Sequence, residues 1–427
     1  MMHRTLSCPL AIALSISGAI ALTACGVSDW DSYAKETSIR MGGAVDSGGQ
    51  LETRSFEVVL EPRDDGVVAI RNLAGSVTVR QDDVDAVFVD ATVYANAGDA
   101  YTSTYLDQMR WIQVTDDSNV TRWTLTYPLD TTRRVHYPWS GSGFEMKTNR
   151  YDGAPLWVTT RRNDQTITMY TDLVITCPAG TELHLSNLAG PIDTSAYTGT
   201  LDLTTYIGDV NVDAADGTLA IDGSVNPVVV GRASGVVRID TGSGDVKIGI
   251  VDGDSLVDTG SGTITIDDAS GSILNADTGS GGITIGAINL DELIADTGSG
   301  GIAIGTGHAE VITADTGSGG IRVDGATFHR MVADTGSGGI TIQSDMRASE
   351  YLECDTGSGS VTIMLHPDAA FTLNADQGSG SMYIGFDDAA IHGTKYDPTG
   401  ATRGDDGVKI IVDTGSGNCT VKPMSAN

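Results

Sequence analysis

Apolar and polar residues alternate along short segments that recur through the second half of the chain. In Ile283-Thr284-Ile285, Ile302-Ala303-Ile304 and Ile321-Arg322-Val323, side chains two residues apart are apolar. A period of two places such side chains on one face of a β-strand. β-Branched residues are frequent, and glycine interrupts any helical period. The pattern therefore predicts strands with one buried face.

A five-residue motif, Asp-Thr-Gly-Ser-Gly, punctuates these strands. It occurs eight times, and a ninth copy reads Asp-Gln-Gly-Ser-Gly. Successive copies are 18, 19, 19, 19, 19, 21, 21 and 37 residues apart. A period near 20 is typical of solenoids, in which each repeat contacts only its neighbours. The copies begin at Asp240, Asp258, Asp277, Asp296, Asp315, Asp334, Asp355, Asp376 and Asp413.

The repeats predict an all-β fold, a single-stranded parallel β-helix (β-solenoid) with rungs of 18–21 residues. Stacked rungs would pair in parallel about 4.8 Å apart around a narrow apolar core. Right-handed coiling is the usual outcome of parallel crossovers. We expect the glycines of each motif to supply positive φ angles, and the copy at Asp413 to form the last rung.

The chain divides into four parts on this pattern. They are a signal peptide (1–24), a flexible tether (25–54), an N-terminal β region (55–185) and the solenoid (186–423). The N-terminal region holds an early rung at Asn72–Val79. It also holds an aromatic-rich insertion at about 94–171, which we expect to form antiparallel strands that cover the open end of the stack. A polar, glycine-containing insertion at 387–406 is expected to be a surface loop.

The N-terminus carries a processing signal. The apolar stretch Leu10–Leu22 follows a basic start and is too short to span a bilayer. It ends in Leu22-Thr23-Ala24-Cys25, which resembles the lipobox of bacterial lipoproteins. The resemblance implies acylation of Cys25 and anchoring to the cell envelope; an ordinary signal peptide is the alternative. Gly26 stands where an inner-membrane retention signal would place Asp, so the outer membrane is expected in a Gram-negative host.

Charge and cysteine content narrow the classes of partner. With 56 acidic and 25 basic residues, the formal net charge is −31. Such a field repels nucleic acid and attracts cations or basic partners, and no Lys or Arg cluster offers a nucleic-acid site. Apart from the signal and the anchor, the cysteines are Cys177, Cys354 and Cys419. Their odd number and spacing favour small core residues over disulfides or a metal site.

The DTGSGxIxI rungs resemble a bacterial domain of unknown function that is named as a putative adhesin, a single-chain β-helix of envelope proteins. The segments SFEVVLEPRDDGVVAIRNLAGSVTV and LVITCPAGTELHLSNLAGPIDT look like its entry strands and its Pro-Gly turn. The resemblance covers most of residues 55–423 and implies the β-helical fold. The tryptophan-rich insertion and the segment 387–406 depart from the family's pattern.

Asp-Thr-Gly-Ser is also the signature of aspartic proteases. That chemistry needs two carboxylates that share one proton in a cleft between two lobes. Nine copies at the period of a rung predict a rod instead. The sequence has no HExxH, GxSxG or GxxxxGK[ST] motif. We therefore expect a protein without catalytic activity.

The motif aspartates are expected to point outward, each accepting hydrogen bonds from its own turn. Carboxylates stacked about 5 Å apart repel one another by about 1 kcal/mol in water. Protonation or bound cations would relieve this repulsion, and Ca²⁺ prefers oxygen ligands. The sequence thus suggests weak divalent-cation sites on an aspartate ladder. The candidate ligands are Asp240, Asp258, Asp277, Asp296, Asp315, Asp334 and Asp355.

Four of the five tryptophans lie in the aromatic insertion. They either fill the core of that region or form platforms on which sugars stack. Trp139, in a polar Pro-Trp-Ser-Gly stretch, is expected to be the most exposed, and is the candidate glycan contact. The histidines are expected to be scattered and to form no ligand cluster. They are His136, His184, His308, His329, His366 and His392.

These features favour a non-catalytic, lipid-anchored envelope protein that acts as an adhesin-like or scaffold module, with glycans or other envelope proteins as partners. A divalent-cation-binding or envelope-stress-sensing component is the alternative. A polysaccharide-active β-helix enzyme fits less well, because few Lys or Arg accompany the carboxylates.

Overall fold

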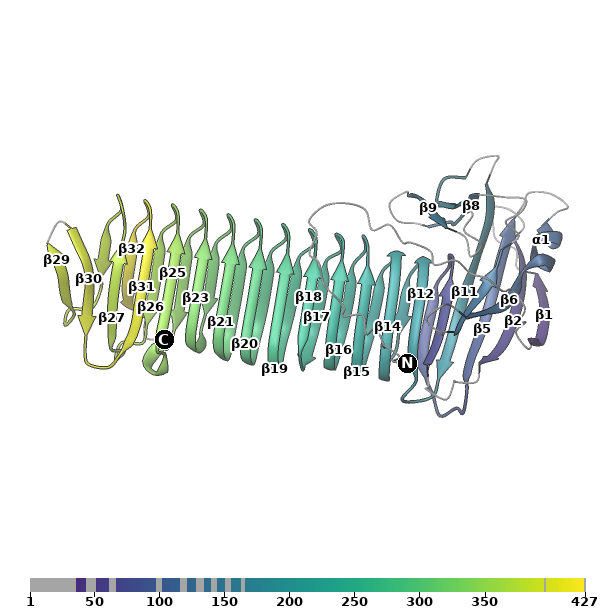
Figure 1. Ribbon diagram of the computed structural model, residues 1–427, viewed down its shortest axis with the longest axis horizontal. Helices are drawn as coiled ribbons and strands as arrows, with labels where there is room; N and C mark the ends of the chain where they lie inside the picture. Colours follow the sequence, from purple (N-terminus) through teal and green to yellow (C-terminus); the bar gives the residue numbers. More distant parts are fainter. Residues whose placement is uncertain are drawn as a thin grey trace, which may run out of the picture.

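The computed structural model describes residues 36–43, 51–60, 67–96, 102–115, 121–127, 134–139, 144–149, 155–162, 166–394 and 397–425. The predicted signal peptide, Cys25 and most of the predicted tether lie outside these ranges. The described chain is a long rod of β-strands with a broader region at its N-terminal end (Figure 1). No helix in the described ranges is long and apolar enough to cross a membrane.

The broader region contains eleven strands and the one α-helix of the described chain. Their bounds are β1 (Glu36–Gly43), β2 (Glu52–Leu60), β3 (Val67–Asn72), β4 (Val77–Gln81), β5 (Val87–Asn96), α1 (Thr102–Gln108), β6 (Arg110–Thr115), β7 (Thr121–Thr126), β8 (Arg134–His136), β9 (Glu145–Asn149), β10 (Pro155–Thr159) and β11 (Ile167–Cys177).

The rod itself contains the remaining strands and one 3₁₀ turn. Their bounds are β12 (Glu182–Ala189), β13 (Ile192–Thr194), β14 (Tyr197–Ile207), β15 (Val210–Gly223), β16 (Val228–Thr241), β17 (Val246–Asp252), β18 (Ser255–Thr259), β19 (Ile264–Thr278), β20 (Ile283–Thr297), β21 (Ile302–Thr316), β22 (Ile321–Asp324), β23 (Ala326–Thr335), β24 (Ile340–Ser344), η1 (Met346–Ala348), β25 (Tyr351–Thr356), β26 (Val361–Leu365), β27 (Phe371–Asp376), β28 (Met382–Ile384), β29 (Ala390–Thr394), β30 (Asp397–Arg403), β31 (Val408–Thr414) and β32 (Cys419–Pro423).

The rod is the predicted parallel β-solenoid. It makes about 11 turns with rungs of about 19 residues. Successive rungs pair in parallel and in register, so that Asp277 lies between Asp258 and Asp296. The early rung predicted at Asn72–Val79 is present as β3 and β4, which stack on β12 and β13. The motif turns follow the ends of the strands along the upper edge of the rod in Figure 1.

Each rung contributes several apolar side chains to one continuous core. In β20 the buried residues are Ile283, Ile285, Ile288, Leu290, Leu293 and Ala295, all between 0 and 4% exposed. Burying one isoleucine or leucine stabilises the fold by about 1.5–3 kcal/mol. Cys354 and Cys419 occupy inward positions and are fully buried, as the alternation predicts, and Cys177 is buried too.

The strand pairing of the solenoid continues into the N-terminal region through β4 and β3. On one side β4 pairs in parallel with β11, and β11, β5, β2 and β1 then pair antiparallel. On the other side β3 pairs with β7, which pairs antiparallel with β6. The predicted aromatic insertion is therefore confirmed as β-structure at this end of the stack. The sequence did not predict helix α1 or the parallel pairing of β8 with β10 and β11.

Two predictions for the C-terminal end of the rod are wrong. The rung at Asp413 is not the last in space, because β31 lies between β25 and β27 and pairs with both in parallel. The segment 387–406 is not a plain loop, since β29 and β30 form an antiparallel hairpin within it and β30 pairs antiparallel with β27. An identical motif can pair with any motif rung, so the sequence alone does not fix the order of the last rungs.

Phe371, Phe386 and Arg403 form a cluster at the C-terminal end of the core, which we call the end plug. The rings of Phe371 and Phe386 lie 5.4 Å apart, and the guanidinium of Arg403 lies 4.9 Å from the Phe386 ring. Arg403 also pairs with Asp388 at 2.6 Å. In the Asp-Gln-Gly-Ser-Gly copy of the outermost motif rung, Gln377 stands where the other copies have threonine. Gln377 donates instead from Nε2 to the carbonyl of Pro398 in the hairpin, at 2.8 Å.

Candidate functional site

The threonine of each motif holds the turn together from inside. The same alternation that turns the aspartate outward turns this threonine inward. Thr297 is fully buried; its hydroxyl donates to the carbonyl of Gly281 in the preceding rung at 2.8 Å and accepts from the amide of Gly300 in its own turn at 3.0 Å. The same pair of bonds recurs at Thr259, Thr278, Thr316, Thr335 and Thr356.

This arrangement corrects the Asx-turn prediction. The carboxylates of the motif aspartates from Asp240 to Asp355 accept no hydrogen bond and form no ion pair with any described residue. Only Asp376, in the outermost rung, accepts from its own turn, through the amide of Gly378 at 3.1 Å. The threonine hydroxyl does what the sequence assigned to the aspartate.

The motif glycines allow close stacking, not left-handed turns. Among the described motif glycines, only Gly378 has a φ in the left-handed region, at 49°. A Cβ built on Gly300 would lie 1.8 Å from the carbonyl oxygen of Gly281, and one on Gly298 would lie 2.3 Å from that of Gly279. Side chains at these positions would push neighbouring rungs apart. The prediction of positive φ was therefore wrong, and the glycines are there because the backbones of adjacent turns touch.

The motif aspartates form a single outward file along this edge. Paired register places Asp222 and all nine motif aspartates in one column, with Asp413 between Asp355 and Asp376. Burial raises the pKa of Asp258 above the usual value for a carboxyl, and the carboxylates of Asp277 and Asp240 raise it further. The order of causes is the same at Asp355, where burial comes before the neighbours Asp334 and Asp413.

Burial also raises the pKa of the intervening carboxyls. It is the largest cause at Asp277, Asp296, Asp315 and Asp334. A file of carboxyls whose charged forms are disfavoured will accept protons or cations more readily than isolated aspartates. Within the described residues, no group of three or more His, Cys, Asp or Glu side chains is arranged to hold a metal ion. The file is thus a ladder of single carboxylates on an outer face, and not a cleft with a protease-type pair.

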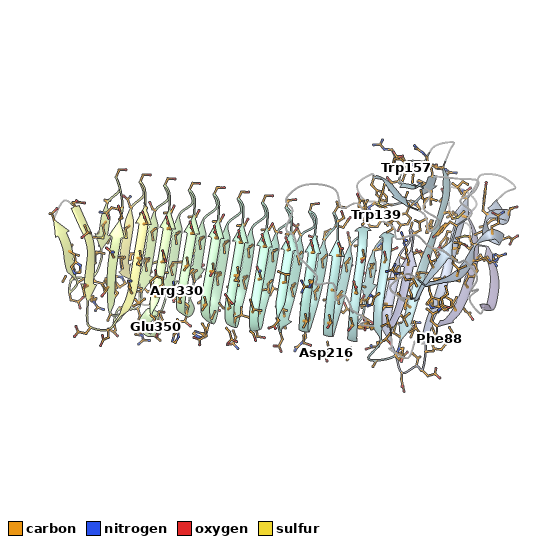
Figure 2. All side chains as sticks on the ribbon, in the orientation of Figure 1. Phe88, Trp139, Trp157, Asp216, Arg330 and Glu350 are labelled. Carbon is orange, nitrogen blue, oxygen red and sulfur yellow. The ribbon has the colours of Figure 1, made fainter. Side chains whose placement is uncertain are left out.

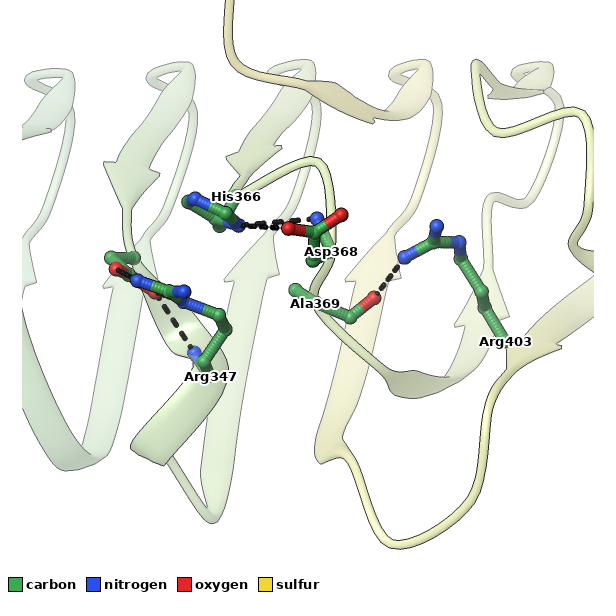
Figure 3. Close-up of polar contacts among 6 residues, drawn as sticks. Arg347, His366, Asp368, Ala369 and Arg403 are labelled. Atoms are coloured by element: carbon green, nitrogen blue, oxygen red, sulfur yellow. Dashed lines mark hydrogen bonds and ion pairs between the residues drawn. The ribbon is translucent and has the colours of Figure 1, made fainter.

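The corner opposite the motif turns brings together histidines that the sequence analysis treated as scattered. Glu310 bridges His308 and His329, with oxygen-to-nitrogen distances of 3.4 and 3.0 Å. His329 follows Glu310 by one rung of 19 residues, and this spacing could have predicted the contact. On the next rungs Asp345 pairs with Arg347, and His366 lies 3.8 Å from Asp368 (Figure 3).

A cleft of about 400 Å³ opens at this corner. It is lined by His308, Thr327, Phe328, His329, Asp345, Arg347, Ala348 and Ser349. The cleft exists because the rung from Ile340 is two residues longer than those before it, and the extra residues form the turn η1. On its rim the carboxylate of Asp345 pairs with the guanidinium of Arg347 at 2.6 Å, so these two opposite charges offset each other.

Trp139, which the sequence predicted to be the most exposed tryptophan, is half-buried. It packs against the core of the N-terminal region, and its ring stacks on Tyr137 with centroids 6.1 Å apart. Trp157 is half-buried as well, beneath the guanidinium of Arg134 at 5.6 Å. Both tryptophans lie on the same side of the N-terminal region (Figure 2). Trp111 is only 1% exposed and belongs to the core.

Comparison with known protein families finds one match in the second half of the chain. Residues 257–422 match the Toastrack DUF4097 family. No curated protein matches the chain.

Solved structures that resemble the chain come from three bacterial species. A "putative lipid binding protein" from Parabacteroides distasonis is 14% identical, with 88% of this chain and 99% of that chain covered and a TM-score of 0.27. A "putative adhesin" from Bacteroides fragilis is 12% identical, with 89% and 100% covered and a TM-score of 0.21. A "putative cell adhesion protein" from Clostridium sporogenes is 8% identical, with 87% and 100% covered and a TM-score of 0.17. Identities and scores this low say nothing about function.

The matched residues begin within β18 and end within β32, so they span seven of the eight complete motifs and the inserted rung. The resemblance to a β-helical domain of unknown function is thereby confirmed for this part of the chain, while the lipoprotein assignment stays a prediction. Residues 257–422 are therefore similar to the Toastrack DUF4097 family, over less than half of the chain.

Proposed function

We propose that the protein is a non-catalytic, lipid-anchored component of the bacterial cell envelope, whose solenoid acts as a rigid adhesin-like or scaffold module. The unbroken parallel ladder carries this proposal. Every rung from Val228 to Thr316 pairs in register with the next, and its turns are cross-linked by the threonine hydroxyls. Such a rod presents one outward pattern many times, which suits an extended or repetitive partner.

A glycan array tests the adhesin part of this proposal. The chain would be applied with and without Ca²⁺, and we expect retention on a small set of repetitive envelope glycans. A scaffold would instead retain envelope proteins in a cross-linking experiment on whole cells. Absence of both, at protein concentrations up to about 10 µM, would contradict the proposal. Weak multivalent binding gains strength from several sites acting together.

Trp139 separates a sugar contact from a purely structural role. The Trp139→Ala variant should lose glycan retention while keeping the thermal midpoint of the parent chain within about 2 °C. Trp157→Ala is a matched control, because Trp157 is also half-buried in the same region. Unfolding of the Trp139→Ala variant would mean that the stack on Tyr137 is structural.

Membrane attachment depends on Cys25, which lies outside the described residues. Metabolic labelling with a palmitate analogue should mark the chain in a bacterial host and should fail for Cys25→Ser. Fractionation would then show whether the labelled chain follows the outer membrane. A labelled Cys25→Ser variant, or an unlabelled parent, would remove the anchor from the proposal.

The aspartate ladder supports a second candidate function, the binding of divalent cations. The supporting observation is the run of motif carboxyls from Asp258 to Asp355, which have no hydrogen-bond or ion-pair partner among the described residues and have raised pKa values. Millimolar Ca²⁺ should then raise the thermal midpoint, and EDTA should reverse the shift. A variant with Asp296→Asn and Asp315→Asn should respond less. An unchanged midpoint in the parent chain would rule this function out.

A further inference from the structure

The rung made by β31 and β32 fills a slot between two rungs that precede it in the chain. β31 pairs with β25 on one side and β27 on the other, and β32 lies between β26 and β28 in the same way. No direct pairing joins β25 to β27 in the described chain. Strands on either side of a third are about 9.6 Å apart, twice the usual spacing. Without residues 408–423 the slot would therefore be one rung wide.

A four-residue crossover leads the chain into this slot. β30 lies along the outer edge of β27 and β31 along its inner edge, so the connection must pass over the start of β27. Gly404 has a φ of 69°, and Asp406, at 54°, is the one described residue other than glycine with a positive φ. A Cβ on Gly407 would lie 2.0 Å from the carbonyl carbon of Ala370. The crossover is short, tightly packed and strained at Asp406.

The inserted rung is held by the same kinds of contact that join every other pair of neighbouring rungs. Asp413 takes its place in the aspartate file, and the amide of Gly417 donates to the Thr414 hydroxyl, as in the other motifs. The rung also contributes buried apolar side chains to the core. These are Val408, Ile410, Val412, Cys419 and Val421. A rung of the same sequence from a second molecule would make every one of these contacts.

We propose that residues 404–423 are an exchangeable rung, and that in a dimer each copy inserts this rung into the slot of the other. Exchange keeps all rung contacts and allows residues 404–407 to extend, which removes the left-handed conformation at Asp406. Short hinge loops under strain favour such exchange. An extended crossover of four residues reaches about 13 Å, so the two copies lie side by side at the corner beside Ala370.

The negative charge of the chain determines the salt and protein concentrations at which exchange should occur. Each chain carries a formal charge of −31, so two copies repel one another over the distances at which they must meet. Salt screens this repulsion, with a Debye length of about 8 Å at physiological ionic strength. The dimer should therefore form after refolding at high protein concentration and at high salt, and should be scarce in dilute solution at low salt.

A pair of cysteine variants detects exchange directly. Ser360 and Asn418 are neighbours on adjacent rungs, because the Asn418 amide donates to the Ser360 hydroxyl at 3.2 Å. Neighbouring strand positions lie within the reach of a disulfide. One variant carries Ser360→Cys and the other Asn418→Cys, both in a background in which every native cysteine is replaced (Cys8→Ser, Cys25→Ser, Cys177→Ala, Cys354→Ala and Cys419→Val). When the two are unfolded, mixed, refolded and oxidised, a covalent dimer requires that the rung of one copy enters the slot of the other.

Two controls make either outcome decisive. A single chain with both Ser360→Cys and Asn418→Cys, refolded in dilute solution, should form the disulfide internally and so shows that the geometry permits it. Gly282→Cys mixed with Gly301→Cys places the same pair in the middle of the stack, where no exchangeable rung exists, and should give no covalent dimer. A covalent dimer from the first mixture alone supports the proposal. None from that mixture, or equal amounts from both, overturns it.

The crossover itself gives an independent test. The dimer fraction of refolded Asp406 variants would be measured by light scattering after size-exclusion chromatography. Asp406→Gly relieves the left-handed strain and should lower the dimer fraction of refolded protein several-fold. A dimer fraction that is unchanged in Asp406→Gly would contradict the proposal.

Discussion

Asp355 and Asp413 face each other on the paired strands β25 and β31, although Asp376 comes between them in the sequence. Their carboxylates are close enough that Asp413 helps to raise the pKa of Asp355. The pairing of Asp355 with Asp413 reflects two properties of the repeated motif. The motif is uniform enough for rungs to pair out of chain order, and it places like charges side by side wherever they pair.

The second glycine of each motif should be the position least tolerant of a side chain. In Gly300→Ala the methyl group would meet the Gly281 carbonyl at 1.8 Å, so the rungs must separate. We expect a loss of at least about 2–3 kcal/mol in the free energy of unfolding, measured with urea. Gly301→Ser is the matched control, because serine occupies the equivalent position at Ser360. Its effect should stay below about 1 kcal/mol, and equal losses would contradict the role given to backbone contact.

The buried threonine hydroxyl should contribute measurably at each turn. Thr297→Val keeps the shape of the side chain but leaves the Gly281 carbonyl and the Gly300 amide without their partner. Unsatisfied buried groups cost about 1–3 kcal/mol. Thr284→Val changes an outward threonine on the same strand and should be nearly neutral. If urea unfolding finds the two variants equally stable, the hydroxyl does not hold the turn.

The aspartate ladder should make the rod more stable in mild acid than at neutral pH. Because the folded-state pKa of these carboxyls is raised, the folded chain binds more protons than the unfolded chain near the usual carboxyl pKa of about 4. Stability from this source is full below that pH and is lost as pH rises through the folded-state pKa. Thermal midpoints measured between pH 4 and 7 at constant ionic strength should therefore fall with rising pH.

A single substitution ties this pH dependence to the file. Asp296→Asn removes one charge between two neighbours, and should raise the stability at pH 7 by about 1 kcal/mol and flatten the pH profile. Asp267→Asn is the control, because Gly249 and Gly286 occupy the same position on the neighbouring rungs. A gain in both variants would point to the net charge of the chain instead of the ladder.

The end plug should depend on Arg403. This side chain covers the Phe386 ring, pairs with Asp388 and donates to the carbonyl of Ala369 at 2.6 Å (Figure 3). Arg403→Met keeps the apolar cover but loses the polar contacts. Hydrogen exchange should then speed up in β27 and β30 while β19 to β21 remain protected. Uniform exchange along the rod would mean that the plug does not act locally.

The sequence was sufficient for the fold and for the direction of most side chains. Alternation around Ile283 and its equivalents identified the buried columns, and the motif period identified the rungs. It misassigned the polar roles within the turn, because a motif shows which residues recur and not which atoms meet. The inward position of Thr297 did follow from the same alternation and could have revealed the hydroxyl bonds. The place of Asp413 could not be found this way, since its motif is identical to seven others.

The position of β31 has a consequence for incomplete chains. In a solenoid that stacks in chain order, loss of the last repeat gives a shorter but intact rod. Here a chain that lacks residues 408–423 would keep its terminal rung at Asp376 and lose the one beneath it. The defect would be an internal break that exposes the core on both sides. Completion of this rung therefore acts as a check that the whole segment has been made.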